Sequence, residues 1–231
     1  RNFSEYMIVG IHQPQYLPWI PYFQKIKQCD TFIILDNVEF HKNGLQNRNK
    51  IKSSVGYQWL TVPVRHKRNQ KILDVLINNK INWRRKHYQS ISLNYSKSIF
   101  FNDYQESFKK IYNRDWDKLV DLNMELIYLV MKILNINTKI LKSSDMIEEG
   151  KSTKLLVNLC KQVGATTYLS GIGAKDYLDE DEFLSNNIEL VFNSPLLPTK
   201  YKQIYNKIEF LNDLSVVDII MNCGNQWNKY F

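Results

Sequence analysis

Apolar and polar positions alternate along the chain in blocks that predict strands and helices in turn. Residues 7–11 and 31–35 are short apolar runs, typical of buried strands. Between them, the stretch "PYFQKIKQC" places its apolar residues at helical spacing behind a proline suited to a first helical turn. A strand, a helix and a strand in this order predict a βαβ unit of a parallel sheet.

The same alternation continues to the end of the chain. Further strands are predicted at residues 59–64, 72–77, 138–141, 166–171 and 188–192. Helices are predicted at residues 82–95, 102–113, 117–134, 152–164 and 213–224, with Ser152 and Asp213 as the caps of the last two. We therefore expect a single α/β domain over residues 7–231, with a mostly parallel sheet, flanking helices and a helical insertion at about 82–134. Residues 1–6 are interpreted as a truncation or a remnant of cloning.

Composition narrows the class of protein. The 231 residues are 44% hydrophobic and 23% charged, which is ordinary for a globular protein, and the net charge is +8. The cations are spread out, which favours a phosphate-bearing small molecule over a nucleic-acid groove. The three cysteines are far apart and have no metal-ligand spacing, which is typical of reduced thiols in a cytoplasmic protein. No transmembrane segment or export signal is predicted, and the sequence does not predict an oligomeric state.

The stretch "IHQPQYLPW" directly follows the first predicted strand and is unusually rich in amides, aromatics and proline. Prolines 14 and 18 should make this loop stiff and should push Gln13 and Leu17 toward extended conformations. A stiff loop can hold polar groups in a fixed array at low entropic cost, which suits a binding site. The alternative is a proline-rich turn whose amides only satisfy neighbouring backbone.

Polar clusters also follow two other predicted strands, and a parallel sheet would bring all three clusters to one edge. His12 is the leading acid or base, and Asp36 or Glu39 could orient it or act as the base instead. Lys42 and Arg48 could clamp a phosphate or carboxylate, although either could be a solvated surface cation. The complete set of predicted substrate-binding residues is Gln13, Gln15, Tyr16, Trp19, Tyr22, Lys42, Asn43, Asn47, Arg48, Ser170, Gly171 and Lys175.

Taken in order, several segments resemble the WbqC-like family of bacterial proteins found in polysaccharide and O-antigen gene clusters. These segments are "IHQPQYLPW", "LDNVEFHKNGLQNRNKI", "WLTVPV", "WRRKHYQSI", "LVDLNMELI", "GATTYLSGIGAKDYLD" and "DLSVVDIIMNCG". The resemblance implies a transferase that places glycine or a similar acyl group on an O-antigen sugar.

We therefore expect an enzyme that transfers an acyl or aminoacyl group to an amino sugar linked to a nucleotide. Its partners would be the nucleotide sugar and an activated acyl donor such as acyl-CoA, and no metal motif is present. Tyr16 and Trp19 would stack on sugar rings, Gln13 and Gln15 would bind hydroxyls, and Asn47 with Arg48 would hold the substrate or its oxyanion. An ATP-dependent ligase or nucleotidyltransferase is an alternative, as is a non-catalytic protein that binds sugar nucleotides.

Overall fold

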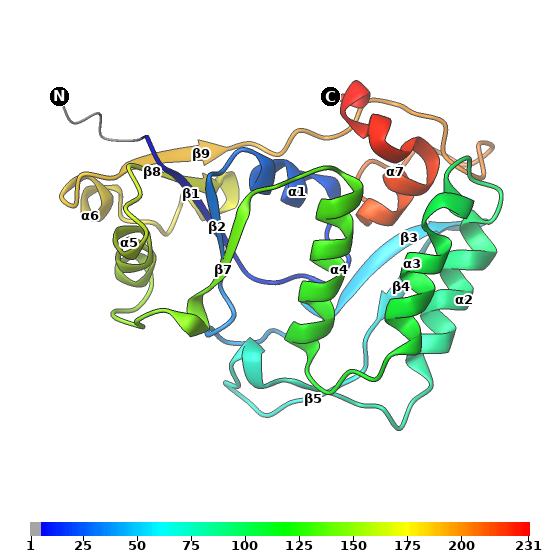
Figure 1. Cartoon of the computed structure of the whole chain (residues 1–231), viewed down its shortest axis with the longest axis horizontal. Helices are drawn as coiled ribbons and strands as arrows, with labels where there is room; N and C mark the ends of the chain where they lie inside the picture. Colours follow the sequence, from blue (N-terminus) through cyan, green and yellow to red (C-terminus); the bar gives the residue numbers. More distant parts are fainter. Residues whose placement is uncertain (1–5) are drawn as a thin grey trace. The chain divides into compact units, whose positions relative to one another are not determined.

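Five short strands form one parallel sheet in the computed structural model, which describes residues 6–231. The strands are β1 (Ile8–His12), β2 (Thr31–Ile34), β7 (Lys139–Lys142), β8 (Thr167–Gly171) and β9 (Glu189–Asn193). Their order in the sheet is β7-β2-β1-β8-β9, and each neighbouring pair is parallel (Figure 1). The α/β fold with a parallel sheet, predicted from the alternating pattern, is confirmed.

The chain builds this sheet outward from β1 in two directions. β2 and then β7 are added on one side of β1, whereas β8 and then β9 are added on the other. In doubly wound α/β folds, ligands bind outside the carboxyl ends of the strands at the place where the winding reverses. That place lies here between the ends of β1 and β8, which are direct neighbours.

The two central strands β1 and β2 are largely apolar because consecutive residues, which point to opposite faces of the sheet, are buried in both. All four residues of β2 and the three central residues of β1 are buried. Gly10 lies in the middle of β1, where an added Cβ would be 2.7 Å from the sulfur of Cys29 and 2.9 Å from the ring of Phe32. Glycine is therefore needed at this position, where Cys29 and Phe32 pack directly against the backbone of β1.

The helices linked to these strands are α1 (Ile20–Lys27), α5 (Thr153–Gln162) and α6 (Glu180–Leu184).

Two compact units divide the chain. Among the described residues, the first comprises residues 6–13, 21–37 and 137–196 and contains the parallel sheet, and the second comprises residues 14–20, 38–136 and 197–231. The single domain with an insertion remains a prediction. The interpretation of residues 1–6 falls mostly on residues 1–5, which lie outside the described residues.

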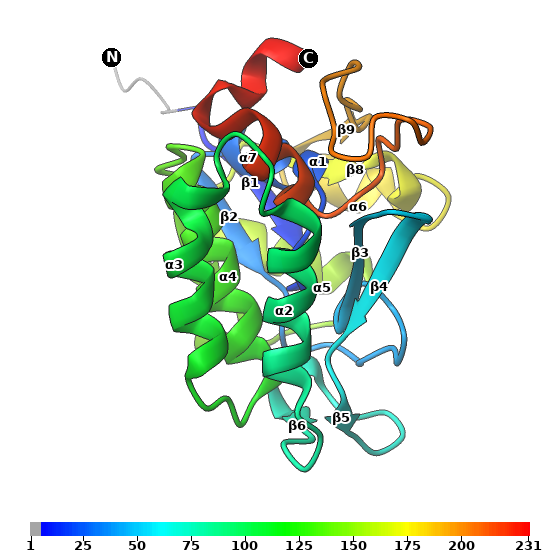
Figure 2. The same cartoon turned by 90° about the vertical axis from the view of Figure 1, so that its right-hand side faces the viewer.

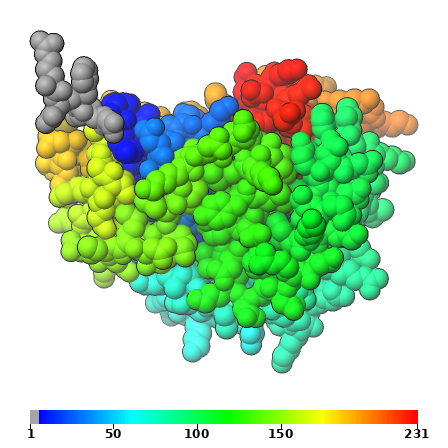
Figure 3. Space-filling view, viewed as in Figure 1, coloured from blue at the N-terminus to red at the C-terminus, as the bar shows by residue number. Residues whose placement is uncertain are grey.

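The second unit is largely helical. It contains α2 (Trp83–Tyr95), α3 (Phe101–Asn113) and α4 (Leu119–Ile133), of which α3 packs against both others, and α7 (Val216–Cys223) (Figure 2). Two hairpins complete it, β3 (Arg48–Ser53) with β4 (Gly56–Thr61), and β5 (Val64–Arg65) with β6 (Leu76–Ile77). Leu119, Leu122 and Leu126 of α4 are buried, so this apolar face of the helix is core. The outward side chains of α3 and α4 contribute to the green surface in Figure 3.

Several local predictions were wrong. Ser152 precedes α5 but has a φ of 53° and makes no capping hydrogen bond. The cap of α7 is Ser215, whose hydroxyl accepts from the N–H of Val217, so α7 begins after Asp213 and needs no cap from it. The strand expected at residues 72–77 begins with a 3₁₀ turn (Ile72–Asp74), and only Leu76–Ile77 is extended.

Leu17 also departs from the extended conformation expected before proline, because its φ is 44°. Contacts within the second unit outweigh the local preference. The side-chain amide of Asn49 donates to the Leu17 carbonyl at 2.7 Å, the N–H of Val216 donates to the Pro18 carbonyl at 2.9 Å, and the Leu17 side chain is fully buried. The loop is fixed, as its sequence suggested, but it is fixed in a strained conformation.

Candidate functional site

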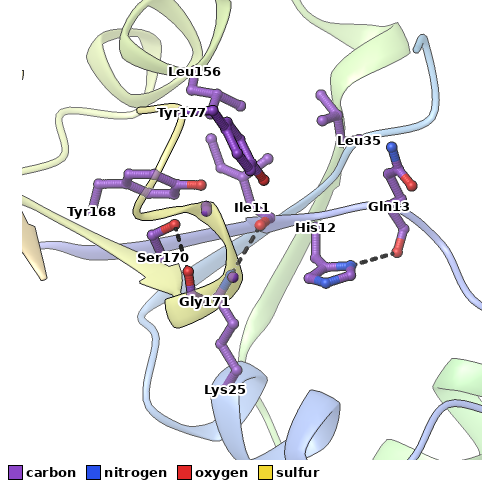
Figure 4. A pocket seen from close by; sticks show the side chains of 12 residues that line it. Ile11, His12, Gln13, Lys25, Leu35, Leu156, Tyr168, Ser170, Gly171 and Tyr177 are labelled. Atoms are coloured by element: carbon purple, nitrogen blue, oxygen red, sulfur yellow. Dashed lines mark hydrogen bonds between the residues drawn. The ribbon is translucent and has the colours of Figure 1, made fainter. Parts of the chain in front are cut away.

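A pocket of about 390 Å³ lies in the first unit, where β1 and β8 end (Figure 4). β1 and the residue after it contribute His12 and Gln13, α1 contributes Lys25, and β8 contributes Ser170 and Gly171. The pocket therefore occupies the position at which the reversal of strand order predicts a ligand site. Four of the predicted site residues, His12, Gln13, Ser170 and Gly171, meet there.

The imidazole of His12 has a defined orientation at the pocket. Its Nδ1 lies 3.1 Å from the Gln13 carbonyl, and its ring packs edge-on against Tyr22 at a centroid distance of 5.1 Å. The carbonyl can only accept, so the proton must be on Nδ1 and Nε2 is left as an acceptor. Burial and the nearby charge of Lys25 lower the pKa of His12 to about 4. The ring is therefore neutral near pH 7 and has a free lone pair.

Tyr22 positions the end of β1. Its hydroxyl donates to the Gln13 carbonyl at 3.0 Å, and its side chain is buried. The same carbonyl also contacts His12, so Tyr22 and His12 together fix the peptide that leaves the strand. Tyr22 was predicted to bind substrate directly, and its described contacts suit a positioning residue.

The residues predicted near the end of β8 lie at different depths. Ser170 is buried and its hydroxyl is 3.4 Å from the Gly171 carbonyl, too long for a strong hydrogen bond. Lys175 is exposed just after a 3₁₀ turn (Ile172–Ala174) and does not line the pocket. Ser170 and Gly171 thus belong to the pocket wall, and Lys175 lies beyond it.

Asp36 lies after β2 and is buried, with its carboxylate used by neighbouring groups. It accepts from the hydroxyl of Ser143 at 3.0 Å and from the N–H and hydroxyl of Ser144 at 2.9 and 2.7 Å. These serines begin the turn after β7, so Asp36 ties the ends of two neighbouring strands together. Among the described residues Asp36 accepts no hydrogen bond from His12, and the catalytic role of Asp36 stays a prediction.

Five other predicted site residues belong to the second unit: Glu39, Lys42, Asn43, Asn47 and Arg48. Asn43 has a φ of 60°, its N–H donates to the side chain of Asn47, and Asn47 donates in turn to the Val62 carbonyl. These contacts are those of a turn. Glu39 and Lys42 are exposed. Arg48 begins β3 and stacks over Trp59, its guanidinium carbon 4.4 Å from the ring centroid.

The aromatic residues of the proline-rich loop are likewise held in the second unit. The hydroxyl of Tyr16 is hydrogen-bonded to His87 at 2.7 Å and to Tyr112, and its side chain is fully buried. Gln15 is buried and its Oε1 has no hydrogen-bond partner among the described residues. Trp19 forms an isolated bridge with Ser215. The depth of Tyr16 makes it a core residue in this structure, and stacking on a sugar is not supported for it.

Comparison with known proteins decides the family. The sequence model of the WbqC-like protein family matches residues 13–230. The chain belongs to the WbqC-like family. This WbqC-like chain is also 35% identical over 226 residues to an uncharacterized protein, Rv1507c, of Mycobacterium tuberculosis (strain ATCC 25618 / H37Rv), with 96% of each chain covered. No solved structure matches the chain significantly. The resemblance inferred from the sequence motifs is confirmed.

Lys25 is the residue of this WbqC-like pocket that sequence reasoning missed. It lies three residues after Tyr22 and four before Cys29, so it shares the apolar stripe of α1, and its side chain is buried. A lysine on the buried face of an amphipathic helix is unusual and could have been noticed. Tyr177 and Leu156, which also line the pocket, gave no comparable signal.

The cysteines of the WbqC-like chain are all buried and free, and burial raises the pKa of Cys29, Cys160 and Cys223 to about 12. The thiols are therefore protonated and poor nucleophiles near pH 7. We expect Cys→Ser variants at the three positions, made singly, to keep turnover within about threefold. Steady-state rates check this, and inactivation by an alkylating reagent that substrate prevents would contradict it.

Neither a membrane helix nor a metal cluster is found in residues 6–231. None of the helices there is long and apolar enough to span a bilayer. No group of three or more His, Cys, Asp or Glu side chains in that range is arranged to hold a metal ion.

Proposed function

We propose that this protein is a transferase that places an acyl or aminoacyl group, such as glycine, on the amine of a nucleotide-linked amino sugar. The observation that supports it most is the pocket at the ends of β1 and β8, which is lined by His12, whose Nε2 is unprotonated. The O-antigen setting is what the resemblance of the sequence motifs to the WbqC-like family implies. The acyl donor would be an activated ester or thioester, such as acyl-CoA.

The chemistry needs a proton acceptor beside the amine. The amine nitrogen attacks the acyl carbonyl carbon, a new C–N bond forms, and the bond from that carbon to the leaving group breaks. The proton lost by the amine would go to His12 Nε2 and from there to the leaving group. A pKa of about 4 makes His12 a weak base in the free protein. A bound anion would raise the pKa of His12, because opposite charge favours the imidazolium.

A second candidate, nucleotidyl transfer or ATP-dependent ligation, is favoured by the strand order. The winding of the sheet reverses beside β1, and His12 closes that strand. Pockets at such reversals bind nucleotides in many doubly wound folds. A non-catalytic protein that binds sugar nucleotides would use the same pocket without turnover.

Measurements of ligand binding and of the mass of the product distinguish the transferase, the nucleotidyltransferase or ligase, and the non-catalytic binding protein. Thermal shift should reveal stabilisation by a UDP- or dTDP-linked amino sugar, and mass spectrometry with acyl-CoA donors should show the acylated sugar. Conversion of ATP to pyrophosphate or AMP would favour the second candidate. Stabilisation without product would favour the binding protein. If neither sugar nucleotides nor acyl donors bind, the proposed transferase is wrong.

Substitution of Tyr177, a tyrosine on the pocket wall, tests whether the sugar binds there, and Tyr128 offers a matched control. Tyr177 lines the pocket and is 67% exposed, whereas Tyr128 on α4 is 48% exposed and does not line it. If the sugar packs on the Tyr177 ring, Tyr177→Ala should weaken its binding about fivefold or more, a loss of about 1 kcal/mol. Tyr128→Ala should leave binding unchanged. Calorimetric titration checks both, and equal affinities for the two variants would remove Tyr177 from the site.

A further inference from the structure

The ammonium group of Lys25 lies buried beside the pocket. Its side chain is 6% exposed, and its Nζ donates to the Ile11 carbonyl at 3.0 Å. Figure 4 shows the side chain reaching up from α1 to the end of β1, close to Gly171. The ring of Phe32 lies 5.9 Å from Nζ. Lys25 therefore brings a positive charge to the floor of a cavity whose other walls carry His12, Ser170 and Tyr168.

This charge has no counter-ion among the residues that the structure describes. No ion pair of Lys25 with a carboxylate is found among residues 6–231. The titratable neighbours that act on it are the thiols of Cys29 and Cys160, which burial keeps protonated, with pKa values of about 12. His12 is neutral near pH 7. Burial lowers the pKa of Lys25 to about 8, so at pH 7 most of the molecules still carry the charge.

A purely structural lysine does not explain this arrangement. An unpaired buried charge is costly, and one hydrogen bond to a carbonyl that already ends a strand does little to offset it. The remaining two N–H groups of the ammonium are donors without a described acceptor. Buried groups with perturbed pKa values cluster at functional sites, and a ligand of opposite sign would complete this one.

We propose that Lys25 binds an anionic group, phosphate or carboxylate, of the ligand that occupies this pocket. This inference rests on the proposed function, because it assumes that the pocket holds a ligand. In that function the nucleotide sugar would supply a phosphate, and an amino-acid-like donor would supply a carboxylate. The anion would lie between Nζ of Lys25 and the end of β8, within reach of the Ser170 hydroxyl. The same anion would bring negative charge near His12 and make it a stronger base.

The test uses small anions and no turnover, so it can fail or succeed independently of the transferase. Pyrophosphate, phosphate and acetate are titrated at low ionic strength into the wild type, Lys25→Met and Lys27→Met. Lys27 is exposed on the same helix, so its substitution removes one charge without touching the pocket. We expect at least one anion to bind the wild type and Lys27→Met alike, and to bind Lys25→Met at least tenfold more weakly. Preference for pyrophosphate over acetate would identify phosphate as the group that is bound.

Stability separates binding from a structural role. Without anion, Lys25→Met should unfold at the same temperature as the wild type or higher, because the buried charge is gone. If that variant unfolds at lower temperature yet binds anions like the wild type, Lys25 is structural and the proposal is wrong. It is equally wrong if none of the three anions binds the wild type.

A measurement on the wild type alone keeps the proposal testable if Lys25→Met does not fold. Proton NMR of the four histidines, with His12 assigned by a His12→Asn spectrum, gives the pKa of His12 with and without pyrophosphate. We expect the anion to raise that pKa from about 4 toward its ordinary value. An unchanged pKa of His12 at saturating pyrophosphate would place the anion elsewhere and overturn the proposal.

Discussion

His12→Ala should lower turnover by about 10²-fold or more and leave the unfolding temperature close to that of the wild type. The ring faces the pocket at the end of β1, where its Nδ1 contacts only the neighbouring Gln13 carbonyl. Truncation therefore removes the acceptor Nε2 and the edge contact with Tyr22, but it breaks no hydrogen bond to another element. Steady-state rates and thermal unfolding of the variant check the two halves of this expectation.

Two further variants sharpen the test. His12→Gln keeps an acceptor oxygen but cannot take up a proton, so it should be as slow as His12→Ala if the ring acts as a base, and faster if the ring only accepts a hydrogen bond. His41→Ala removes an exposed imidazole from the second unit and should leave rates unchanged. A His12→Ala variant that loses activity only in proportion to its stability would make His12 structural.

Much of the first unit was predictable because parallel strands leave a strong pattern. β1, β2 and β8 are short apolar runs followed at once by polar residues, and these runs were assigned correctly. Strand order was not predictable, since nothing local specifies that β8 pairs with β1 rather than with β7. The meeting of His12 with Ser170 depends on that long-range pairing.

The site was predicted less completely than the fold, and for identifiable reasons. Asn43 and Asn47 resemble ligand-binding residues in the sequence, but backbone turns use the same amides. Tyr16 was predicted to stack on a sugar ring, yet long-range contacts with His87 and Tyr112 bury it. Lys25 was overlooked because its helix was interpreted from the apolar members of its stripe alone.

Loop conformations and helix caps were also predicted incompletely from local sequence. Local rules place Leu17 in an extended conformation before Pro18, but Asn49 and Val216 hold this loop with hydrogen bonds from elsewhere in the second unit. The choice of Ser215 over Asp213 as the cap of α7 is fixed by where that helix packs. Such features are set by tertiary contacts, which override preferences worth only about 1 kcal/mol.

Asp218→Ala should destabilise the second unit strongly. Asp218 lies on α7 and is fully buried, and its carboxylate accepts from the hydroxyl of Tyr95 at 3.0 Å, the amide of Gln203 at 2.8 Å and the hydroxyl of Tyr201. Alanine would leave these three buried donors without their acceptor. We expect a loss of about 3–5 kcal/mol in the free energy of unfolding, measured by urea denaturation. For a chain of this length that is a drop of about 10 °C in midpoint.

Asp218→Asn is the matched control, because it keeps an acceptor oxygen and the side-chain shape but cannot ionise. Burial raises the pKa of Asp218 from 3.8 to about 6 in the folded protein. Between these values the folded state binds more protons than the unfolded state, so this group makes the wild type less stable as the pH rises from 4 to 6, by on the order of 3 kcal/mol. Above pH 6 the full cost of the buried carboxylate is present, and this group no longer makes the unfolding free energy depend on pH.

The difference in unfolding free energy between the wild type and Asp218→Asn should therefore change across pH 4–6 and be constant above pH 6. A difference that is flat from pH 4 to 8 would mean that Asp218 ionises in the folded protein as readily as in the unfolded chain, and that its three hydrogen bonds fully offset its burial.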